Sequence, residues 1–332
     1  MMRLFVGVDG GGTKTRTLVV AEDGTCLGVA LTGASNPNSV GARKAHENLI
    51  EGLKNAAATA GSEAAFAAAF FGISGVNDSL TAKAFRQELA ADARIKFAAL
   101  EVENDTRSLC ASAFGMQSGI VLIAGTGSKC YGRTEDGREW ETGGYDFHVS
   151  DEASAFDLAR RGLTAAVRAA DGRGEPTLLK DILFKELQIV ETGQISQRLH
   201  QDSLKHPGTP MTKDEIAALA VHVGNAYLAG DAVAGKILKT AMSDLADMVE
   251  AVARKLEMPA ETLRLGITGG VILNEPCATL FREALLERFP QCEIFEPQEP
   301  PVVGAAIRAL SLGGVKVTPD VLAKLSDSFK AL

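Results

Sequence analysis

Residues 4–15 read Leu-Phe-Val-Gly-Val-Asp-Gly-Gly-Gly-Thr-Lys-Thr, an apolar run that ends in a carboxylate and three consecutive glycines. The apolar run predicts a short buried strand, and the glycines predict a tight turn directly after it. Backbone N–H groups in such a turn can face an oxyanion, and Asp9 at the strand end can hold Mg²⁺ through water. The stretch contains neither a Walker A loop nor a G-x-G-x-x-G motif. Taken alone, it fits equally well a glycine-rich hairpin in which Asp9 is only a turn residue.

The order of predicted elements in the first part of the chain is repeated in the second. The first part is expected to contain strands over 4–8, 17–21 and 26–31, a helix over 43–60, a strand over 67–73, a helix over 80–91 and a strand over 97–102. The second part is expected to contain strands over 119–124 and 130–133, a helix over 151–169, a strand over 263–268, a helix over 275–288, a strand over 293–295 and a helix over 302–312. The tripeptide Glu-Asp-Gly occurs in both parts, at 22–24 and at 135–137. This repetition predicts a duplicated α/β fold with a cleft between its halves.

Two further glycine turns follow predicted strands. Gly125-Thr126-Gly127-Ser128 stands at the matching place in the second half, and Gly269-Gly270 follows the strand over 263–268. A strand-to-helix turn often contains glycine for close packing alone. Three such turns at equivalent positions are harder to explain by packing and favour phosphate binding.

An additional helical segment is expected inside the second half. Thr212 and Glu215 have the spacing of a capping box, which predicts a helix start after a proline-containing loop. A break at Gly230-Asp231 precedes a long run with apolar residues at helical spacing up to Leu256. Core-forming helices explain this segment better than a partner-binding face.

The composition excludes several classes of protein. The chain has 332 residues, 46% hydrophobic and 23% charged, which indicates a globular protein of two domains. Its net charge of −8 disfavours a nucleic-acid surface. The five cysteines are scattered without C-x-x-C spacing, which is typical of reduced thiols in a cytoplasmic protein. No apolar stretch approaches the ~20 residues of a membrane span, and no histidine pair has metal-ligand spacing.

The glycine turns, together with Pro301-Val302-Val303-Gly304-Ala305-Ala306, resemble the signatures of the actin/hexokinase/Hsp70 ATPase superfamily. More closely, the chain resembles the branch that contains N-acetylglucosamine kinases and the BadF/BadG/BcrA/BcrD ATPases. Further matching pieces are Asn104-Asp105, Gly143-Gly144-Tyr145 and Asp151-Glu152-x-Ser154-Ala155. The similarity extends from residue 3 to about residue 312, with the motifs in the family's order.

This resemblance implies an α/β fold of two duplicated actin-like (ribonuclease H-like) ATPase domains that flank a nucleotide cleft. The expected N-terminal domain covers 1–117, and the expected C-terminal domain covers 118–315 and carries the helical insertion. A C-terminal helix over 316–332 is expected to pack back on the N-terminal domain.

The resemblance also implies roles for individual residues. Those expected at the phosphates of ATP are Gly11, Gly12, Thr13, Lys14, Thr126 and Gly127, and those at the adenosine are Gly269 and Gly270. Those expected at the sugar are Asn36, Asp105, Gly144, Tyr145 and Asp151. Asp9 is expected to organise Mg²⁺ through water, and Asp105 to be the general base on the sugar hydroxyl. From the residues alone, Asp105 would instead be read as the N-cap of the helix that follows it.

The activity implied is transfer of the γ-phosphoryl group of ATP to a hydroxyl of an amino sugar. The 6-hydroxyl is the expected acceptor, and N-acetylglucosamine is the leading substrate. Where kinases of this branch usually have glycine, the chain has Asp146, Ser150 and Ala153. The carboxylate of Asp146 could meet a free amine, so glucosamine stays open, as does N-acetylmuramate.

A different class, an ATPase that activates a partner enzyme as the BadF/BcrA-type activators do, is disfavoured because no cysteine has a suitable neighbour for an iron–sulfur cluster. A sugar-sensing regulator is disfavoured because the chain begins at its first strand without a helix-turn-helix. The expected ligands are ATP, Mg²⁺ and the sugar, without nucleic acid or membrane, in the cytoplasm; a homodimer is left open.

Overall fold

The computed structural model describes residues 2–332, which form two five-stranded sheets of the same topology. The strand order of the first sheet is β3-β2-β1-β5-β7, and that of the second is β10-β9-β8-β11-β12. In each sheet the three strands that come first in the sequence lie in the reverse of their sequence order. The two later strands of the sheet follow beside the first one. The duplicated α/β fold predicted from the sequence is therefore confirmed.

The first sheet contains three antiparallel strands followed by two parallel ones. Its strands are β1 (Leu4–Gly10), β2 (Lys14–Ala21), β3 (Cys26–Gly33), β5 (Ala68–Ile73) and β7 (Leu100–Glu103), and a separate two-stranded sheet pairs β4 (Ala65–Phe66) with β6 (Lys96–Phe97). β1 pairs antiparallel with β2 and parallel with β5, and Asp9 lies opposite Gly72 in the second pairing. The carboxyl ends of the parallel strands β1, β5 and β7 therefore meet at one edge of the sheet.

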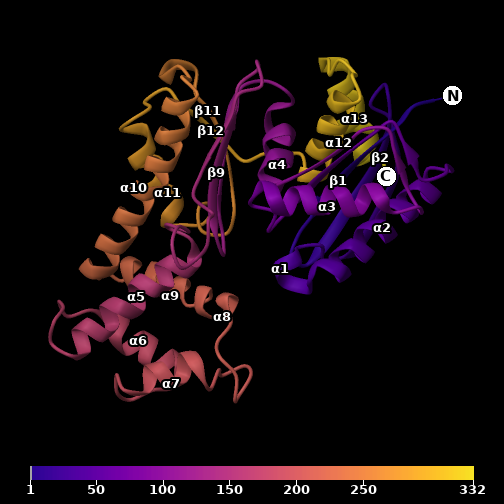
Figure 1. The fold of residues 1–332 in the computed structure, drawn as a ribbon. Coiled ribbons are helices and arrows are strands. Elements are labelled where there is room, and N and C mark those ends of the chain that lie inside the picture. The colour runs from indigo at the N-terminus through magenta and orange to yellow at the C-terminus, as the bar shows by residue number, and fades with distance from the viewer. Residues whose placement is uncertain (1) are drawn as a thin grey trace. The chain divides into compact units, whose positions relative to one another are not determined.

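Alternating side chains of these strands build two separate cores. Val6, Val8 and Phe71 face the helices α2 (Ala42–Thr59) and α3 (Ser79–Ala91), which Figure 1 shows beside the indigo strands. Phe5 and Phe70 belong to the opposite core, which contains α4 (Asp105–Phe114), α12 (Pro301–Leu312) and α13 (Pro319–Lys330). Successive side chains of a strand point to opposite faces of the sheet. Because both sets are apolar here, both faces are covered by helices.

The backbone of α12 passes directly against both β1 and α4. A Cβ atom at Gly7 would overlap the backbone of Ala305 and Ala306, and one at Gly304 would overlap the carbonyl oxygen of Ser108. Only hydrogen at these two positions lets the helix lie this close. The last helix packs in the same unit: the Ser328 hydroxyl accepts from the Cys26 backbone N–H at 2.9 Å.

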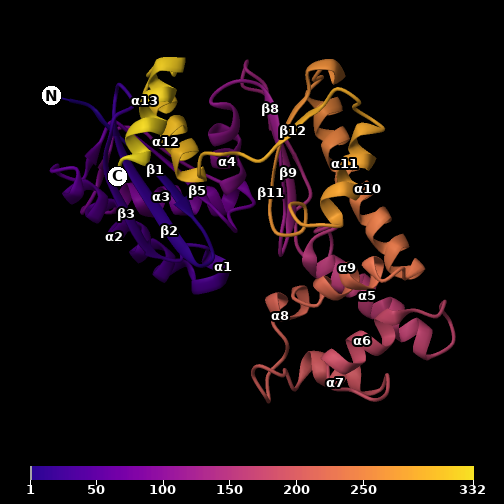
Figure 2. The ribbon, with the colours of Figure 1, turned by 180° about the vertical axis from the view of Figure 1, so that it is seen from behind.

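The second sheet carries the larger set of helices. Its strands are β8 (Gly119–Ala124), β9 (Ser128–Arg133), β10 (Glu139–Thr142), β11 (Arg264–Thr268) and β12 (Glu293–Phe295). Its helices are α5 (Ala155–Ala170), α6 (Leu178–Glu186), α7 (Gln194–His200), α8 (Lys213–Ala217), α9 (Ala220–Leu228), α10 (Ala232–Lys255), the 3₁₀ turn η1 (Ala260–Thr262) and α11 (Cys277–Leu286). Figure 2 shows α10 and α11 beside β11 and β12. The short helix α1 (Pro37–Val40) belongs to the first half.

The chain forms two compact units that are interleaved along the sequence. One contains 1–121, 131–139 and 296–332, and the other contains 122–130 and 140–295. The domain boundaries expected at 117/118 and 315/316 stay a prediction.

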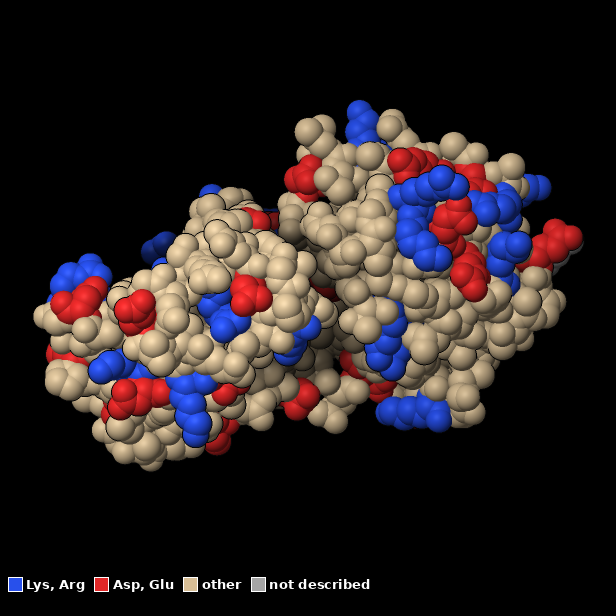
Figure 3. Space-filling model, turned by 90° about the horizontal axis from the view of Figure 1, so that it is seen from below, with Lys and Arg blue, Asp and Glu red and all other residues tan. Residues whose placement is uncertain are grey.

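Across residues 2–332 no single helix is long and apolar enough to cross a membrane, although the bent pair 213–228 with 232–255 meets the length and composition test when taken together. On the face drawn in Figure 3, acidic and basic side chains are interspersed.

Most predicted elements agree with the structure to within a few residues. The capping box is present: Thr212 accepts from the Glu215 N–H, and Glu215 accepts from the Thr212 N–H. The helix predicted from Asp151 begins later, because Ser154 is its N-cap and α5 starts at Ala155. The strand predicted over 97–102 is divided into β6 and β7, which belong to different sheets.

We expect Gly304→Ala to lower the free energy of unfolding by about 1–3 kcal/mol, since the new methyl group must push α4 away from α12. Urea unfolding followed by circular dichroism measures this change. Gly235→Ala is the matched control within helix α10, where a Cβ atom would meet only the Tyr227 ring at ordinary contact distance, 3.4 Å. That variant should be as stable as the parent or more so. Equal urea midpoints for Gly304→Ala and Gly235→Ala would show that the crossing of α12 and α4 tolerates a side chain at residue 304.

Candidate active site

The first glycine turn is tied by its backbone to two neighbouring segments. Gly11 donates to the carbonyl of Lys14 at 3.0 Å, which closes the turn between β1 and β2. The carbonyl of Gly11 accepts from the N–H groups of Ser35 and Asn36 at 3.0 and 3.1 Å, and that of Gly10 accepts from Ser74 at 2.8 Å. Gly12, Thr13 and Lys14 at the tip are exposed. The turn is thus fixed at its base, and its tip is accessible to a ligand.

Asp9 ends the first buried strand beside a second carboxylate. Burial raises the pKa of Asp9 to about 6, and the negative charge of Asp105 adds to this effect, while Arg16 and Lys14 oppose it. Gly72, opposite Asp9 on β5, lets α4 lie close to the sheet, because a Cβ atom there would overlap the Ser108 hydroxyl. Two acids near one sheet edge form a site suited to a cation.

Asn104, and not Asp105, caps helix α4. Its side-chain oxygen accepts from the Thr106 N–H at 3.1 Å and from the Thr106 hydroxyl at 2.8 Å. Its amide group donates to Asn77 at 2.8 Å. The alternative reading of Asp105 as the N-cap is therefore wrong, and Asp105 is the first residue of the helix itself.

Asn36 belongs to the same end of the first sheet. Its side-chain oxygen accepts from the Asn38 N–H at 2.9 Å, and its amide lies 3.4 Å from the Ser74 hydroxyl. Gly75 has a positive φ of 87°, and a Cβ atom there would overlap the Asn36 side chain. The first unit therefore gathers Asp9, the glycine turn, Asn36 and Asp105 at the carboxyl ends of its parallel strands, where ligands of open α/β sheets bind.

The second glycine turn is enclosed by two segments of the second unit. Gly125 donates to the carbonyl of Gly127 at 2.9 Å and accepts from Ala155, the first residue of α5, at 2.8 Å. The N–H of Val271 reaches the Ala124 carbonyl at 2.9 Å. Gly269 has a φ of 112°, and a Cβ atom there would overlap the Ala124 carbonyl, so the third glycine turn packs directly on the second.

A cavity of about 670 Å³ opens beside these two turns. Thr126 and Gly270 line it, together with apolar residues of α5, α9, α10 and α11, whereas Gly127 and Gly269 are not among its lining residues. This volume is within the range of small-molecule sites, and the mixed lining suits a nucleoside with phosphates at its polar end. Sequence reasoning missed four polar lining residues, namely Asp214, Asn225, Asn274 and Glu275. Of these four, only Asn274 could have been identified from the sequence, because it lies just after the Gly269-Gly270 turn.

Asp151 is buried and is paired with a lysine from the helical insertion. The Lys213 ammonium lies 2.7 Å from the Asp151 carboxylate and 5.1 Å from the ring centroid of Phe147. A Cβ atom at Gly127 would be 3.1 Å from the same carboxylate oxygen, so Asp151 lies against the second glycine turn. Sequence reasoning missed Lys213, because nothing in its spacing relates residue 213 to residue 151.

The segment from Gly143 to Ser150 forms a loop closed by its own backbone. The carbonyl of Ser150 accepts from Gly144 at 2.8 Å and from Tyr145 at 3.4 Å, and Tyr145 is exposed. Asp146 is half-exposed; it accepts from the backbone N–H of His148 at 2.9 Å and from its ring at 2.6 Å. These two contacts, the backbone one first, lower the pKa of Asp146.

The protein residues alone do not form a closed metal cage. Within residues 2–332 no three His, Cys, Asp or Glu side chains converge as metal ligands. Asp9 and its neighbour Asp105 instead offer one or two carboxylates. That arrangement fits Mg²⁺, which keeps several waters and takes further oxygens from phosphates.

We expect Asp9 to titrate near pH 6, and its pKa to fall in Asp105→Asn, since the variant removes the neighbouring negative charge. Carbon-13 NMR of the labelled carboxyl groups measures both values. Because protonated Asp9 binds no cation, Mg²⁺ affinity should fall as the pH drops through 6. Asp23→Asn is the control, because Asp23 lies at the β2–β3 turn and does not contribute to the Asp9 shift. An Asp9 pKa near 4 in the parent would contradict the buried, acid-paired environment.

Known proteins resemble the chain over nearly its whole length. An N-acetylmuramic acid/N-acetylglucosamine kinase of Clostridium acetobutylicum is 31% identical over 93% of this chain and 99% of its own. An N-acetyl-D-glucosamine kinase of Dictyostelium discoideum is 28% identical over 93% of this chain and 98% of its own. A solved structure from Chromobacterium violaceum, provisionally named an N-acetylglucosamine kinase, matches 94% of this chain and 99% of its own, with a TM-score of 0.67 and 28% identity. The ROK hexokinase of Thermus thermophilus shares the fold, with a TM-score of 0.54 at 18% identity over 92% of this chain and 97% of its own.

The family itself is defined by the sequence profile that matches residues 6–309, which covers both glycine turns, the helical insertion and the Gly269-Gly270 turn. The resemblance predicted from the motifs is confirmed. The chain belongs to the BadF/BadG/BcrA/BcrD ATPase family.

Proposed function

We propose that this protein is a sugar kinase that transfers the γ-phosphoryl group of ATP to the 6-hydroxyl of N-acetylglucosamine. The observation that carries the proposal is the position of Asp105. It is the first residue of α4 at the carboxyl edge of the first sheet, beside Asp9, and the cap of its helix is supplied by Asn104. Capping therefore does not explain a carboxylate at this position. The names of the relatives from Clostridium and Dictyostelium support an amino sugar as the acceptor.

In this proposal the two units contribute different parts of the reaction. The tip of the first turn (Gly11, Gly12, Thr13 and Lys14) and the second turn (Thr126 and Gly127) bind the phosphates through backbone N–H groups and side chains. Gly270, which lines the cavity of the second unit, and the adjoining Gly269 border the adenosine. Asn36, Gly144, Tyr145 and Asp151 bind the sugar. Asp9 would hold Mg²⁺, which neutralises phosphate charge when bound.

Asp105 acts on the proton of the attacking hydroxyl. As the oxygen forms its bond to phosphorus, the carboxylate accepts the proton, and ADP leaves with the electrons of the broken phosphoanhydride bond. Phosphoryl transfer needs positioning and charge neutralisation more than covalent chemistry from the protein. The fixed base of the first turn and the enclosed second turn fit that requirement.

Asp146 does not favour a free amine at the sugar. Its carboxylate is already bonded to His148 by two contacts and is half-exposed. N-acetylglucosamine is therefore preferred over glucosamine. N-acetylmuramate is the second candidate, because the Lys213 ammonium beside Asp151 could pair with its lactyl carboxylate.

The activator class receives no support from the cysteines. All five (Cys26, Cys110, Cys130, Cys277 and Cys292) are buried, and none is bonded in a disulfide. Burial raises the pKa of the Cys110 thiol to about 12, which disfavours the thiolate that an iron–sulfur cluster needs.

Asp105→Asn should lower kcat by about 10²–10⁴-fold, because the amide cannot accept a proton. The affinity for ATP should stay within a few-fold of the parent. ADP release coupled to NADH oxidation, across N-acetylglucosamine, glucosamine and N-acetylmuramate, measures the first quantity, and calorimetry measures the second. Asp78→Asn is the matched control, since asparagine caps α3 as well as aspartate does and turnover should not change. An Asp105→Asn enzyme within a few-fold of the parent would exclude Asp105 as the base.

Asp146→Gly should leave the ratio of kcat/KM for glucosamine to that for N-acetylglucosamine within about two-fold of the parent, because the carboxylate is engaged by His148. The same coupled assay measures the ratio between pH 6.5 and 8.5, the range in which the glucosamine amine titrates. Asp151→Asn serves as the positive control and should lower turnover of both sugars. If Asp146→Gly selectively reduces glucosamine turnover, and the loss follows the amine's titration, Asp146 selects the amine after all.

A further inference from the structure

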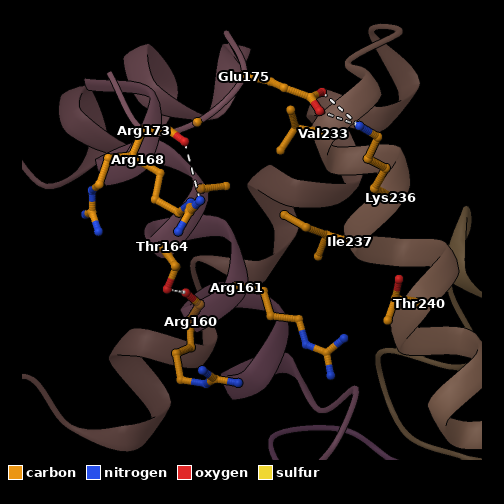
Figure 4. A pocket seen from close by; sticks show the side chains of 12 residues that line it. Arg160, Arg161, Thr164, Arg168, Arg173, Glu175, Val233, Lys236, Ile237 and Thr240 are labelled. Carbon is orange, nitrogen blue, oxygen red and sulfur yellow. Dashed lines mark hydrogen bonds and ion pairs between the residues drawn. The ribbon is translucent and has the colours of Figure 1, made fainter. Parts of the chain in front are cut away.

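A second pocket in the same unit is lined by basic side chains. It has a volume of about 500 Å³ and lies between α5, the loop that follows it and the N-terminal half of α10. Figure 4 shows Arg160, Arg161 and Arg168 projecting from α5 and Val233, Lys236, Ile237 and Thr240 from α10. No residue of this pocket lines the 670 Å³ cavity, and none is among the predicted nucleotide or sugar residues.

The charged residues that line the pocket are five cations and one anion. They are Arg160, Arg161, Arg168, Arg173, Lys236 and Glu175. Glu175 pairs with Lys236 at 2.6 Å across the rim. The other carboxylates that pair with the arginines, Asp157, Asp171 and Asp244, do not line the pocket. The cations therefore outnumber the carboxylates that pair with them by one, and it is the cations that line the pocket.

Arg168 is the cation with the weakest partner. Its guanidinium donates to the carbonyl of Arg173 at 3.4 Å, and within residues 2–332 it forms no ion pair with a carboxylate. Arg173 and Lys236 are exposed at the same rim, with 62% and 66% of their side chains accessible. Guanidinium groups bind phosphate through two parallel hydrogen bonds, so this rim suits a phosphate group.

The rest of the lining is apolar except for Thr164 and Thr240. Ala165, Val233 and Ile237 lie between the charged residues, and the volume is larger than a bare phosphate requires. A phosphate ester with a compact organic body fits both the charges and the remaining space. These residues do not form the long stripe of surface cations that nucleic-acid binding requires.

Two of the pocket arginines are connected to the loop that carries Asp151. Arg160 and Arg161 both pair with Asp157, at 2.6 and 2.7 Å. The same carboxylate accepts from the N–H of Ala153 at 2.9 Å, and Ala153 has a positive φ of 57°. Asp157 therefore holds a strained backbone turn next to Asp151, and the two arginines hold Asp157.

We propose that this pocket is a regulatory site for a small organic phosphate, and that its occupancy loosens the turn at Ala153. The phosphate competes with Asp157 for Arg160 and Arg161, because a dianion attracts both guanidinium groups more strongly than a shared monoanion does. Asp157 then holds the Ala153 N–H less firmly. The effect reaches Asp151 through two residues of backbone within one unit, and it does not depend on which sugar the enzyme phosphorylates.

Calorimetry with the full chain tests the binding step. Excess ADP fills the nucleotide cavity, and fructose 6-phosphate, inorganic phosphate and fructose are titrated separately. Fructose 6-phosphate should bind at one site, inorganic phosphate at least several-fold more weakly and fructose not at all. Arg168→Gln combined with Lys236→Gln should weaken fructose 6-phosphate at least ten-fold. Lys239→Gln, which removes an exposed charge of α10 outside the pocket, should leave it within two-fold.

Hydrogen exchange of the Ala153 amide tests the coupling step. Fructose 6-phosphate should speed this exchange several-fold in the parent and in Lys239→Gln, and should leave it unchanged in the double variant. Absence of binding, or equal loss of affinity in Lys239→Gln, would overturn the site. Equal affinities for inorganic phosphate and the ester would overturn the organic ligand, and binding without a change at Ala153 would overturn the regulation.

Discussion

The buried carboxylate of Asp9 is the constraint around which the candidate site of the first unit is built. It stands where the first buried strand ends, and burial together with the charge of Asp105 raises its pKa to about 6. Relative to an ordinary aspartate, that shift corresponds to about 3 kcal/mol of unfavourable free energy when the group is ionised. Arg16 and Lys14 offset part of the repulsion. A site that keeps two acids close in this way is stabilised by a bound cation, which is why the proposal of Mg²⁺ follows from the protein's own electrostatics.

At three positions the close approach of a neighbouring segment requires glycine. Gly72 lets α4 lie close to the sheet, Gly7 lets α12 cross β1, and Gly269 lets the third turn pack on the carbonyl of Ala124. Each position would place a Cβ atom on a neighbouring backbone or hydroxyl. At Gly269 the same crowding fixes the third turn against the second. Preorganised groups bind a ligand without first losing conformational freedom, so the packing at Gly269 also suits the nucleotide site proposed above.

The fold was predictable because each strand and helix has a local pattern, and because the order of elements repeats. Asp9, Gly125 and Gly269 could be identified for the same reason, since each directly follows an apolar strand. The partners of the site residues could not be predicted. Nothing near Asp151 indicates Lys213, which is 62 residues away. Asn104 and Asp105 are equally good caps by propensity, and only the geometry distinguishes them. The start of α5 was placed too early because Asp151 and Ser154 are both acceptable N-caps, and the backbone turn at Ala153 selects the second.

The three positions at which kinases of the family usually have glycine, Asp146, Ser150 and Ala153, lie on both sides of Asp151 in the chain. Asp146 and Ala153 keep positive φ values of 154° and 57°, the region that glycine prefers, and Ser150 still closes the loop through its carbonyl. A non-glycine residue in such a conformation costs roughly 1–2 kcal/mol. The contacts of Asp146 with His148 and of the Ala153 N–H with Asp157 offset that cost. The loop therefore has glycine-like backbone angles at two of the three positions, and the contacts of Asp146 and Ala153 hold it in that conformation.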